Sequence, residues 1–502
     1  MNVSSFQLPK LKINKNFWKV LQKQPKFAWI ISIIWLLLLS WIGFFWNLGS
    51  LGLMDKTEAL YVEISRQIVL TNDWITPHWN GESFFDYPIG GCWLIALSFK
   101  LFGINEWAAR FPAALSATAL VFLGFYTLRY FGLTRGESQS EEQQLWLTAW
   151  LGAGILAINP AWIAWGRSGV SDMLLASSIS MALLAFFLGY AQPEKPQMQQ
   201  RWYVAFPLFA GIAALIKGPV GIVLPLLIIG SFLLYVGKFR EIWREINPLR
   251  TILLLVAVTL PWYGAATWVN GQEFIERFLG LSNFQRFTSV IYRHAGPWYF
   301  YFPWVLLLLL PWSIYLPGAI ARTRFWQRQA WRKASRSTHL GLFVCFWLAI
   351  VFLFFSVAAT KLAGYILPLI PAAAIAITLF WREELSDIQL QKLRNWPLLV
   401  SGIVNMVILL VVAVAGFYSP QLAGKNSTIG ETLRQSELPL ILAIIWGTAG
   451  LAAFILLWRR QLRCWLWSPN LLGFLAFLSF VAPPLIPLMD AQLQLPWRYL
   501  SG

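Results

Sequence analysis

Charged residues are scarce in this sequence of 502 residues. They make up 12% of the chain, whereas apolar residues make up 58%. Soluble domains contain about 25% charged and about 45–50% apolar residues. The shortage of charge excludes a soluble globular enzyme, a disordered protein and a coiled coil. Long apolar runs recur from end to end, and they predict a polytopic membrane protein.

Cysteine and histidine are also rare. Cys92, Cys345 and Cys464 show no paired spacing, which excludes a disulfide framework and a cysteine-based zinc site. The three histidines include no ligand pair at helical spacing. We therefore expect no cofactor, and a divalent cation held by outer carboxylates is a weaker alternative. Walker and Rossmann loops and a Ser-His-Asp order are absent as well.

Apolar runs long enough, or nearly long enough, to cross a bilayer with about 20 residues predict an all-α integral membrane fold of about 13 helices. The runs are 28–46, 107–131, 144–163, 173–191, 202–216, 218–237, 250–268, 300–320, 338–357, 363–380, 396–418, 438–459 and 470–489.

The net charge of +17 comes from basic residues between these runs. This is the pattern of the positive-inside rule, so we expect no nucleic-acid partner. The lysines before the first run place the N-terminus in the cytoplasm. Four later clusters of basic residues also lie in the cytoplasm, but only if residues 88–103 do not cross the membrane. These clusters are at 238–250, 322–336, 382–394 and 459–463. We therefore predict that 88–103 is an interfacial or re-entrant helix.

With this topology, the charged residues near helix ends outside the basic loops share the outer side. They are Asp55, Glu58, Asp86, Arg167, Asp172, Lys217, Arg293 and Lys361. Ionisable groups at membrane depth are costly and usually functional. The pattern predicts one polar cavity at the outer leaflet, although each residue alone is equally compatible with a solvated loop charge.

The first outer loop, 47–106, contains an expected amphipathic helix at 57–69. Leu60, Ile64, Ile68 and Val69 form one apolar stripe. Such a helix would lie in the interface plane, with Thr57 as its N-cap. The acids beside that cap would then either stabilise the helix or act as a general base at the membrane surface.

Cations lie near three helix ends on the same side. Lys217 stands before a Gly-Pro break, Lys361 lies between two apolar runs, and Arg293 and His294 precede an aromatic cluster. Lysines at such places can simply snorkel to the interface. Their convergence on one leaflet favours an anionic lipid headgroup as the ligand.

Several of these segments resemble one known group of proteins. In this order along the chain, seven segments resemble signatures of polytopic GT-C glycosyltransferases. They are TEALYVEISRQ, NDWITPHWNG, FFDYP, RSGVSDMLL, IKGPVGIVLP, PWYFYFPWVLLLLLPW and FFSVAATKLAGYILPLIP. The resemblance is to the bacterial lipid A aminoarabinose transferases and the related protein O-mannosyltransferase-like proteins. It implies a fold of about 13 helices with interfacial helices in the first outer loop.

The resemblance also implies roles for individual residues. It makes Glu58, Asp86 and Asp172 catalytic carboxylates. It assigns Tyr61, Lys217 and Tyr365 to substrate binding, and it places a phosphate ligand at Arg293 or His294. Three positions depart from the family: Thr57 replaces an Asp, Leu60 an Arg, and Tyr87 a phosphate-binding Lys. The candidate site contains the catalytic residues Asp55, Glu58, Asp86 and Asp172, and the substrate-binding residues Tyr61, Tyr87, Lys217, Arg293, His294, Lys361 and Tyr365.

The sequence thus predicts a glycosyltransferase of the plasma membrane. It would move a sugar from a polyprenyl phosphate to a lipid, glycan or protein acceptor at the outer face. We expect a basic cytoplasmic segment at 1–27, a catalytic transmembrane module at 28–380 and C-terminal helices at 381–502. A transporter or flippase and a non-catalytic relative remain alternatives, of which the transporter is weakened by the absence of repeats.

Overall fold

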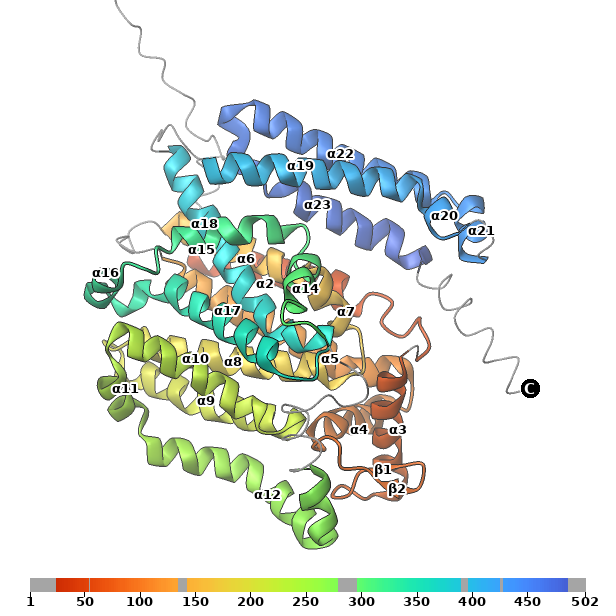
Figure 1. The fold of residues 1–502 in the computed structure, drawn as a ribbon, viewed down its shortest axis with the longest axis vertical. Coiled ribbons are helices and arrows are strands. Elements are labelled where there is room, and N and C mark those ends of the chain that lie inside the picture. The colour runs from red at the N-terminus through yellow and green to blue at the C-terminus, as the bar shows by residue number, and fades with distance from the viewer. Residues whose placement is uncertain are drawn as a thin grey trace, which may run out of the picture.

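The structure is a computed structural model, and it describes residues 24–53, 55–133, 142–278, 296–389, 396–424 and 428–485. These residues form helices and one short hairpin (Figure 1). In chain order the elements of the first half are α2 Pro25–Ser40, η1 Trp41–Phe45, α3 Lys56–Thr71, β1 His78–Trp79, β2 Glu82–Ser83, α4 Gly90–Phe102, α5 Glu106–Phe131, α6 Glu142–Ala157, α7 Pro160–Gly166, α8 Ser171–Tyr190, α9 Pro196–Lys217, α10 Val220–Val236, α11 Phe239–Ile246 and α12 Pro248–Ile275.

The second half is also helical throughout its described part. Its elements are α14 Tyr301–Leu308, η3 Trp312–Tyr315, α15 Leu316–Arg322, α16 Arg328–Lys333, η4 Arg336–Thr338, α17 Leu340–Val357, η5 Ala363–Leu369, α18 Ile370–Gln389, α19 Trp396–Phe417, α20 Ser419–Leu422, α21 Thr428–Gln435, α22 Leu438–Trp458, η6 Arg460–Trp465, α23 Ser468–Ala476 and η7 Phe477–Val481.

Within the described residues, nine helices are long and apolar enough to cross a membrane. The number rises to eleven if each of two bent pairs, α6 with α7 and the α14–α15 region, is one span. α9 and α10 occupy the two remaining predicted runs, so every run contains helix over its described part. The chain is therefore a multi-pass membrane protein.

α8 forms the centre of the bundle, and 18 of its 20 residues are buried within the protein. Small residues such as Ala176, Ser177 and Ser180 alternate with larger apolar ones along it, so neighbouring helices can pack around the whole helix. α8 and α9 lie side by side as an antiparallel pair. The start of α8 consequently meets the end of α9, although these positions are 45 residues apart in the sequence.

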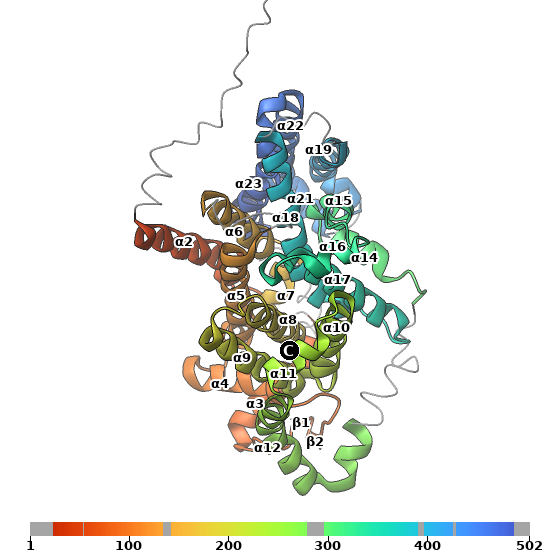
Figure 2. The same ribbon diagram turned by 90° about the vertical axis from the view of Figure 1, so that its left-hand side faces the viewer.

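The C-terminal helices α19, α22 and α23 pack together at one end of the molecule in both views (Figures 1 and 2). α12 and the hairpin lie at the opposite end. α12 is the least enclosed of the long helices, with 11% of its residues buried. Its bulky outward side chains, such as Leu253, Leu260 and Trp268, are what a lipid-facing helix presents.

The loop predicted at 47–106 contains more structure than a simple connection. The helix predicted at 57–69 is confirmed as α3, and its Tyr61, Ile64 and Ile68 are buried against α4. α4 spans 13 residues, which is short of the ~20 that a crossing needs. The pair therefore packs as a unit within the loop, with the β1–β2 hairpin between the two helices in the sequence.

Candidate active site

A partly buried ion pair joins the start of α8 to the end of α9. Lys217 Nζ lies 2.5 Å from Asp172 Oδ1, and the two side chains are 12% and 16% exposed. The left-handed backbone of Gly218 ends α9 directly after Lys217, because only glycine adopts that conformation at little cost. Asp172 stands in the first turn of α8, where the helix dipole favours a carboxylate.

Three tyrosines surround this pair. Lys217 Nζ lies 5.7 Å from the ring centroid of Tyr87 and 5.5 Å from that of Tyr365, which is cation–π distance. The rings of Tyr61 and Tyr87 are 5.5 Å apart. The Tyr61 hydroxyl accepts a hydrogen bond from Ser171 at 2.7 Å, and burial raises the pKa of Tyr61 well above its ordinary value. Five of the predicted site residues therefore lie together, and each comes from a different segment of the chain.

Glu58 is buried in a different set of contacts. Its carboxylate accepts hydrogen bonds from Arg110 Nε at 2.8 Å, from Arg110 Nη2 at 3.0 Å and from the Gly169 amide at 2.7 Å. Arg110 also donates to the carbonyls of Leu48 and Leu51. This carboxylate joins α3 to α5 and to the segment before α8. Its surroundings fit a structural anchor better than a proton acceptor.

Arg110 and Ser171 were missed in the sequence. Arg110 stands inside the apolar run that became α5, and an arginine at such depth is itself a signal of a buried partner. Ser171 carries no such signal, because its role depends on a tyrosine 110 residues away.

Asp55 is an exposed residue at the beginning of α3. It is the N-cap of that helix, and its Oδ1 accepts a hydrogen bond from the Thr57 amide at 3.0 Å. The expectation that Thr57 caps the helix is wrong, because the helix begins one residue before Thr57. A cap side chain must precede the first helical residue to reach the free amides.

Lys361 lies in a buried position on a neighbouring segment. Its side chain is almost fully enclosed, and Nζ donates to the carbonyls of Ser356 and Ala358 at 2.7 Å each. The ammonium also stands over the Tyr301 ring, 6.0 Å from its centroid. Burial lowers the pKa of Lys361. Its partners within the described residues are neutral carbonyls and an aromatic ring, so its charge is left without a carboxylate there.

Arg167 is a second cation held by carbonyls. It donates to the carbonyls of Gly43 and Asn47. Burial lowers the pKa of Arg167 to about 10, with the charge of Arg110 adding to the effect. Around this end of α8, Lys217 and Arg110 pair with the Asp172 and Glu58 carboxylates, while Arg167 and Lys361 are held by neutral carbonyls. Cations held in this way can bind an anionic ligand.

Three predicted site residues remain: Asp86, which the structure describes, and Arg293 and His294, which it does not. Asp86 and Tyr87 lie together at the end of the hairpin segment, and Asp86 is half-buried. Arg293 and His294 lie outside the described residues. In the described part of the chain, His, Cys, Asp and Glu side chains do not gather in a group of three that could hold a metal ion.

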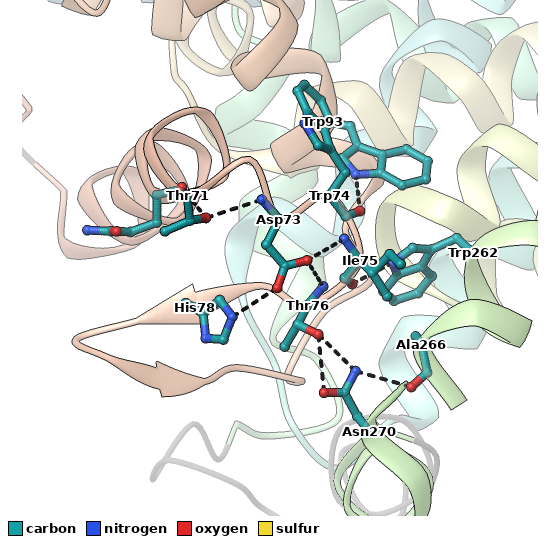
Figure 3. Close-up of polar contacts among 11 residues, drawn as sticks. Thr71, Asp73, Trp74, Ile75, Thr76, His78, Trp93, Trp262, Ala266 and Asn270 are labelled. Carbon is teal, nitrogen blue, oxygen red and sulfur yellow. Dashed lines mark hydrogen bonds and ion pairs between the residues drawn. The ribbon is translucent and has the colours of Figure 1, made fainter. Parts of the chain in front are cut away.

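The segment that leads to Asp86 is anchored by side chains from three elements (Figure 3). Asp73 Oδ1 accepts hydrogen bonds from the amides of Ile75 and Thr76 at 2.9 and 3.0 Å, and its Oδ2 pairs with His78 at 3.2 Å. Burial raises the pKa of Asp73, but these hydrogen bonds outweigh it and hold the pKa below its ordinary value. Trp93 of α4 donates to the Trp74 carbonyl at 2.8 Å.

The helical architecture and the cluster at the start of α8 define the class of protein. The fold matches that of ArnT from Cupriavidus metallidurans bound to undecaprenyl phosphate, with a TM-score of 0.70 at 23% identity over 90% of this chain and 78% of that one. The apo structure of the same protein matches with a TM-score of 0.68. The chain thus has the GT-C fold of polytopic membrane glycosyltransferases.

Sequence comparison identifies the family. Residues 86–264 match the dolichyl-phosphate-mannose-protein mannosyltransferase family. The undecaprenyl phosphate-alpha-4-amino-4-deoxy-L-arabinose arabinosyl transferase of Pseudomonas paraeruginosa is 30% identical over 441 residues, which cover 86% of this chain and 72% of that protein. The corresponding protein of Shewanella sediminis is 26% identical over 455 residues, covering 90% and 76%. The chain belongs to this transferase family.

Proposed function

We propose that this protein transfers a sugar from a polyprenyl phosphate to a lipid acceptor at the outer face of the plasma membrane. The observation that carries the proposal is the partly buried Asp172–Lys217 pair beside the rings of Tyr61, Tyr87 and Tyr365. The names of the relatives support an undecaprenyl-phosphate donor. Arg167 and Lys361, which are held by neutral carbonyls, support an anionic lipid as the ligand.

The reaction is a single displacement at the anomeric carbon. The acceptor oxygen forms a bond to that carbon while the bond from the carbon to the phosphate oxygen breaks. A carboxylate, Asp172 or Asp86, takes the acceptor proton. The polyprenyl phosphate leaves with the electron pair, and Lys217 and Lys361 stabilise its charge. Such a displacement inverts the anomeric centre, so a product with retained configuration would contradict it.

The orientation follows from the basic loops. We place the N-terminus and the Arg336 end of the bundle in the cytoplasm, and the Asp172–Lys217 end at the outer leaflet. α3 and α4 then lie at the membrane interface, and the thirteen helical runs each cross the bilayer. This arrangement lets a lipid-linked donor enter the site from the bilayer.

Tyr87 bears on which sugar the donor carries. The family's phosphate-binding Lys is Tyr87 here, and Tyr87 lies against Lys217. Tyr87 offers the face of an aromatic ring at the position where the family's lysine carries a positive charge. We therefore expect the donor phosphate to bind closer to Lys217 and Lys361. We also expect the donor sugar to differ from aminoarabinose.

The proposed reaction requires no resident metal ion, because lysine ammonium groups supply the positive charge at the leaving phosphate. We expect transfer to continue in EDTA at the untreated rate. Loss of transfer in EDTA and its recovery on adding Mg²⁺ or Zn²⁺ would overturn this part of the proposal.

The test uses the full chain in lipid nanodiscs with synthetic undecaprenyl-phosphate sugars. The wild type is expected to release undecaprenyl phosphate and glycosylate a lipid A acceptor. Lys217→Met should lower kcat/KM by about 100-fold, because it removes a charge that stabilises the leaving group. Lys195→Met is the matched control, since Lys195 is an exposed residue at the other end of α9.

Two outcomes would contradict the proposal. The first is a wild type that releases no polyprenyl phosphate from any donor. The second is equal transfer by the Lys217→Met and Lys195→Met variants. Movement of the lipid between leaflets without a glycosylated product would instead indicate a flippase.

A further inference from the structure

α12 packs along α9, and toward its C-terminal end it also turns a narrow stripe of side chains to the hairpin segment. Trp262, Ala266 and Phe274 are buried, and Asn270 lies in register with them at intervals of four residues. This spacing puts Trp262, Ala266 and Asn270 on one face of α12. The helix then breaks at Gly271, whose φ is 58°, and Phe274 belongs to the helical segment beyond the break. The other faces of α12 are mostly exposed. The stripe faces the segment of the first outer loop that leads to Asp86 and Tyr87.

The upper part of the stripe holds the chain before the hairpin. Trp262 Nε1 donates to the Ile75 carbonyl at 3.0 Å. Asn270 Nδ2 lies 3.0 Å from the Thr76 hydroxyl, and the hydroxyl lies 3.2 Å from Asn270 Oδ1. Asn270 Nδ2 also donates to the carbonyl of Ala266, which fixes the orientation of the amide (Figure 3).

The lower part of the stripe holds the chain after the hairpin. The ring of Phe274 packs edge-on against that of Phe85, with centroids 5.4 Å apart. The two legs of the hairpin are themselves joined, because the Phe84 amide donates to the Pro77 carbonyl at 2.8 Å. α12 therefore clamps the hairpin on both sides of its base, immediately before Asp86.

The residues that α12 holds are followed directly in the chain by residues of the candidate site. Phe85 is buried, so the residue after it has little freedom to move. Tyr87, two residues beyond Phe85, lies against Lys217 and Tyr61. A displacement of about 1 Å at a reacting group can cost on the order of 100-fold in rate. Contacts that fix residues 75–85 can therefore set the geometry of the reaction without touching the substrate.

We propose that Asn270, through its hydrogen bonds with Thr76, is a positioning residue that fixes Asp86 and Tyr87 against the Asp172–Lys217 pair. The inference rests on the proposed glycosyltransferase function and adds to it. It assigns to a largely lipid-facing helix a role in aligning the active site.

The experiment compares four variants in nanodiscs. Thr76→Val removes the hydroxyl while it keeps the shape of the side chain, whereas Thr76→Ser keeps the hydroxyl. Asn270→Ala removes the partner. Thr267→Val is the control, because Thr267 is an exposed neighbour on α12 whose hydroxyl bonds only within its own helix. Steady-state kcat, the KM for the donor and the Tm are measured for each variant.

We expect Thr76→Val and Asn270→Ala each to lower kcat about tenfold with a donor KM within twofold of the wild type. Thr76→Ser and Thr267→Val should retain wild-type kcat. In the double variant of Thr76→Val with Asn270→Ala, kcat should fall no further than in either single variant, because both changes break the same contact.

Several results would overturn the inference. One is an Asn270→Ala variant with the kcat of Thr267→Val. Another is a loss of activity that is fully explained by a smaller folded fraction of the variant. A third is a double variant in which the losses of kcat add. If Asn270→Ala fails to fold, the comparison of Thr76→Val with Thr76→Ser decides the question from the loop side. An inactive wild type would refute the proposed function, and this inference with it.

Discussion

The two ends of the α8–α9 pair are built from similar residues but differ in how their charges are balanced. At one end, Lys217 meets a single carboxylate, Asp172, and two aromatic rings. At the other end, Arg336 binds both Glu241 and Glu245. Glu245 also accepts hydrogen bonds from Gln199 and Tyr203 of α9.

The Arg336 end is a network whose members satisfy one another. The guanidinium is 7% exposed and bonds to two carboxylates on α11, and this ties the segment before α17 to the α8–α9 pair. The Asp172–Lys217 end has one carboxylate for its lysine, and further cations at Arg167 and Lys361. A closed network serves stability, whereas cations held only by neutral carbonyls can take an anionic ligand. Substitutions at the two ends separate these two roles.

The largest expected effect is on catalysis at the Asp172–Lys217 end. Asp172→Asn removes the charge but keeps the size of the side chain. We expect kcat to fall by about 100-fold to 1,000-fold, the range for a group that acts on the proton or on charge in the transition state. Transfer of labelled sugar from an undecaprenyl-phosphate donor measures it. Glu437→Gln, at an exposed residue before α22, is the matched control. Equal rates in the two variants would remove Asp172 from the mechanism.

The next effect is on stability at the Arg336 end. Arg336→Met leaves Glu241 and Glu245 without their shared partner. Breaking a fully buried ion pair costs about 3–5 kcal/mol. Because Glu241 is half exposed and keeps Lys238 as a partner, we expect the free energy of unfolding to fall by only about 1–2 kcal/mol. Thermal unfolding in detergent measures it. The kcat of the folded fraction should stay at the wild-type value, and a large fall in kcat would mean that the two ends are not separate in function.

A smaller effect is expected at Tyr87. Tyr87→Leu removes the ring over Lys217 but keeps an apolar side chain. Cation–π contacts contribute about 0.5–2 kcal/mol, so the donor KM should rise by about threefold to tenfold. Titration of the donor in the transfer assay measures it. Tyr418→Leu is the control, at an exposed tyrosine after α19. An unchanged KM would place the donor away from Tyr87.

The smallest effect is expected at Asp55. Asp55→Ala removes the N-cap of α3, which costs about 1 kcal/mol, while Asp55→Asn keeps a capping oxygen. We expect a slightly lower Tm for the Ala variant and near wild-type transfer for the Asn variant. Transfer and Tm together measure the effect. If both variants lose transfer equally without a change in Tm, Asp55 is catalytic and its cap is incidental.

Much of the architecture could be predicted because the relevant signals are local. The apolar runs and the stripe of Leu60, Ile64 and Ile68 indicate helices at the positions of the observed ones, including α3. The short run at 88–103 is a helix too short to span. The error at Thr57 has an equally local origin. Asp55 and Thr57 are both good caps, and the difference depends on which residue lies outside the helix.

The candidate site was predictable only in part. The topology predicted one side of the membrane for the charged residues, but not which of them pair. Glu58 and Asp172 looked alike as outer carboxylates. The structure gives one a buried arginine 52 residues away and the other a lysine 45 residues away. The roles inferred for Arg293 and His294 stay predictions.

By itself the sequence determined that the chain is a bundle of membrane helices, because hydropathy acts through the surrounding medium and needs no particular partner. Only the tertiary structure decided the pairs Asp172–Lys217, Glu58–Arg110 and Thr76–Asn270. Each pair joins segments that are distant in the chain. Its formation depends on how helices pack, and therefore on shape as well as on polarity.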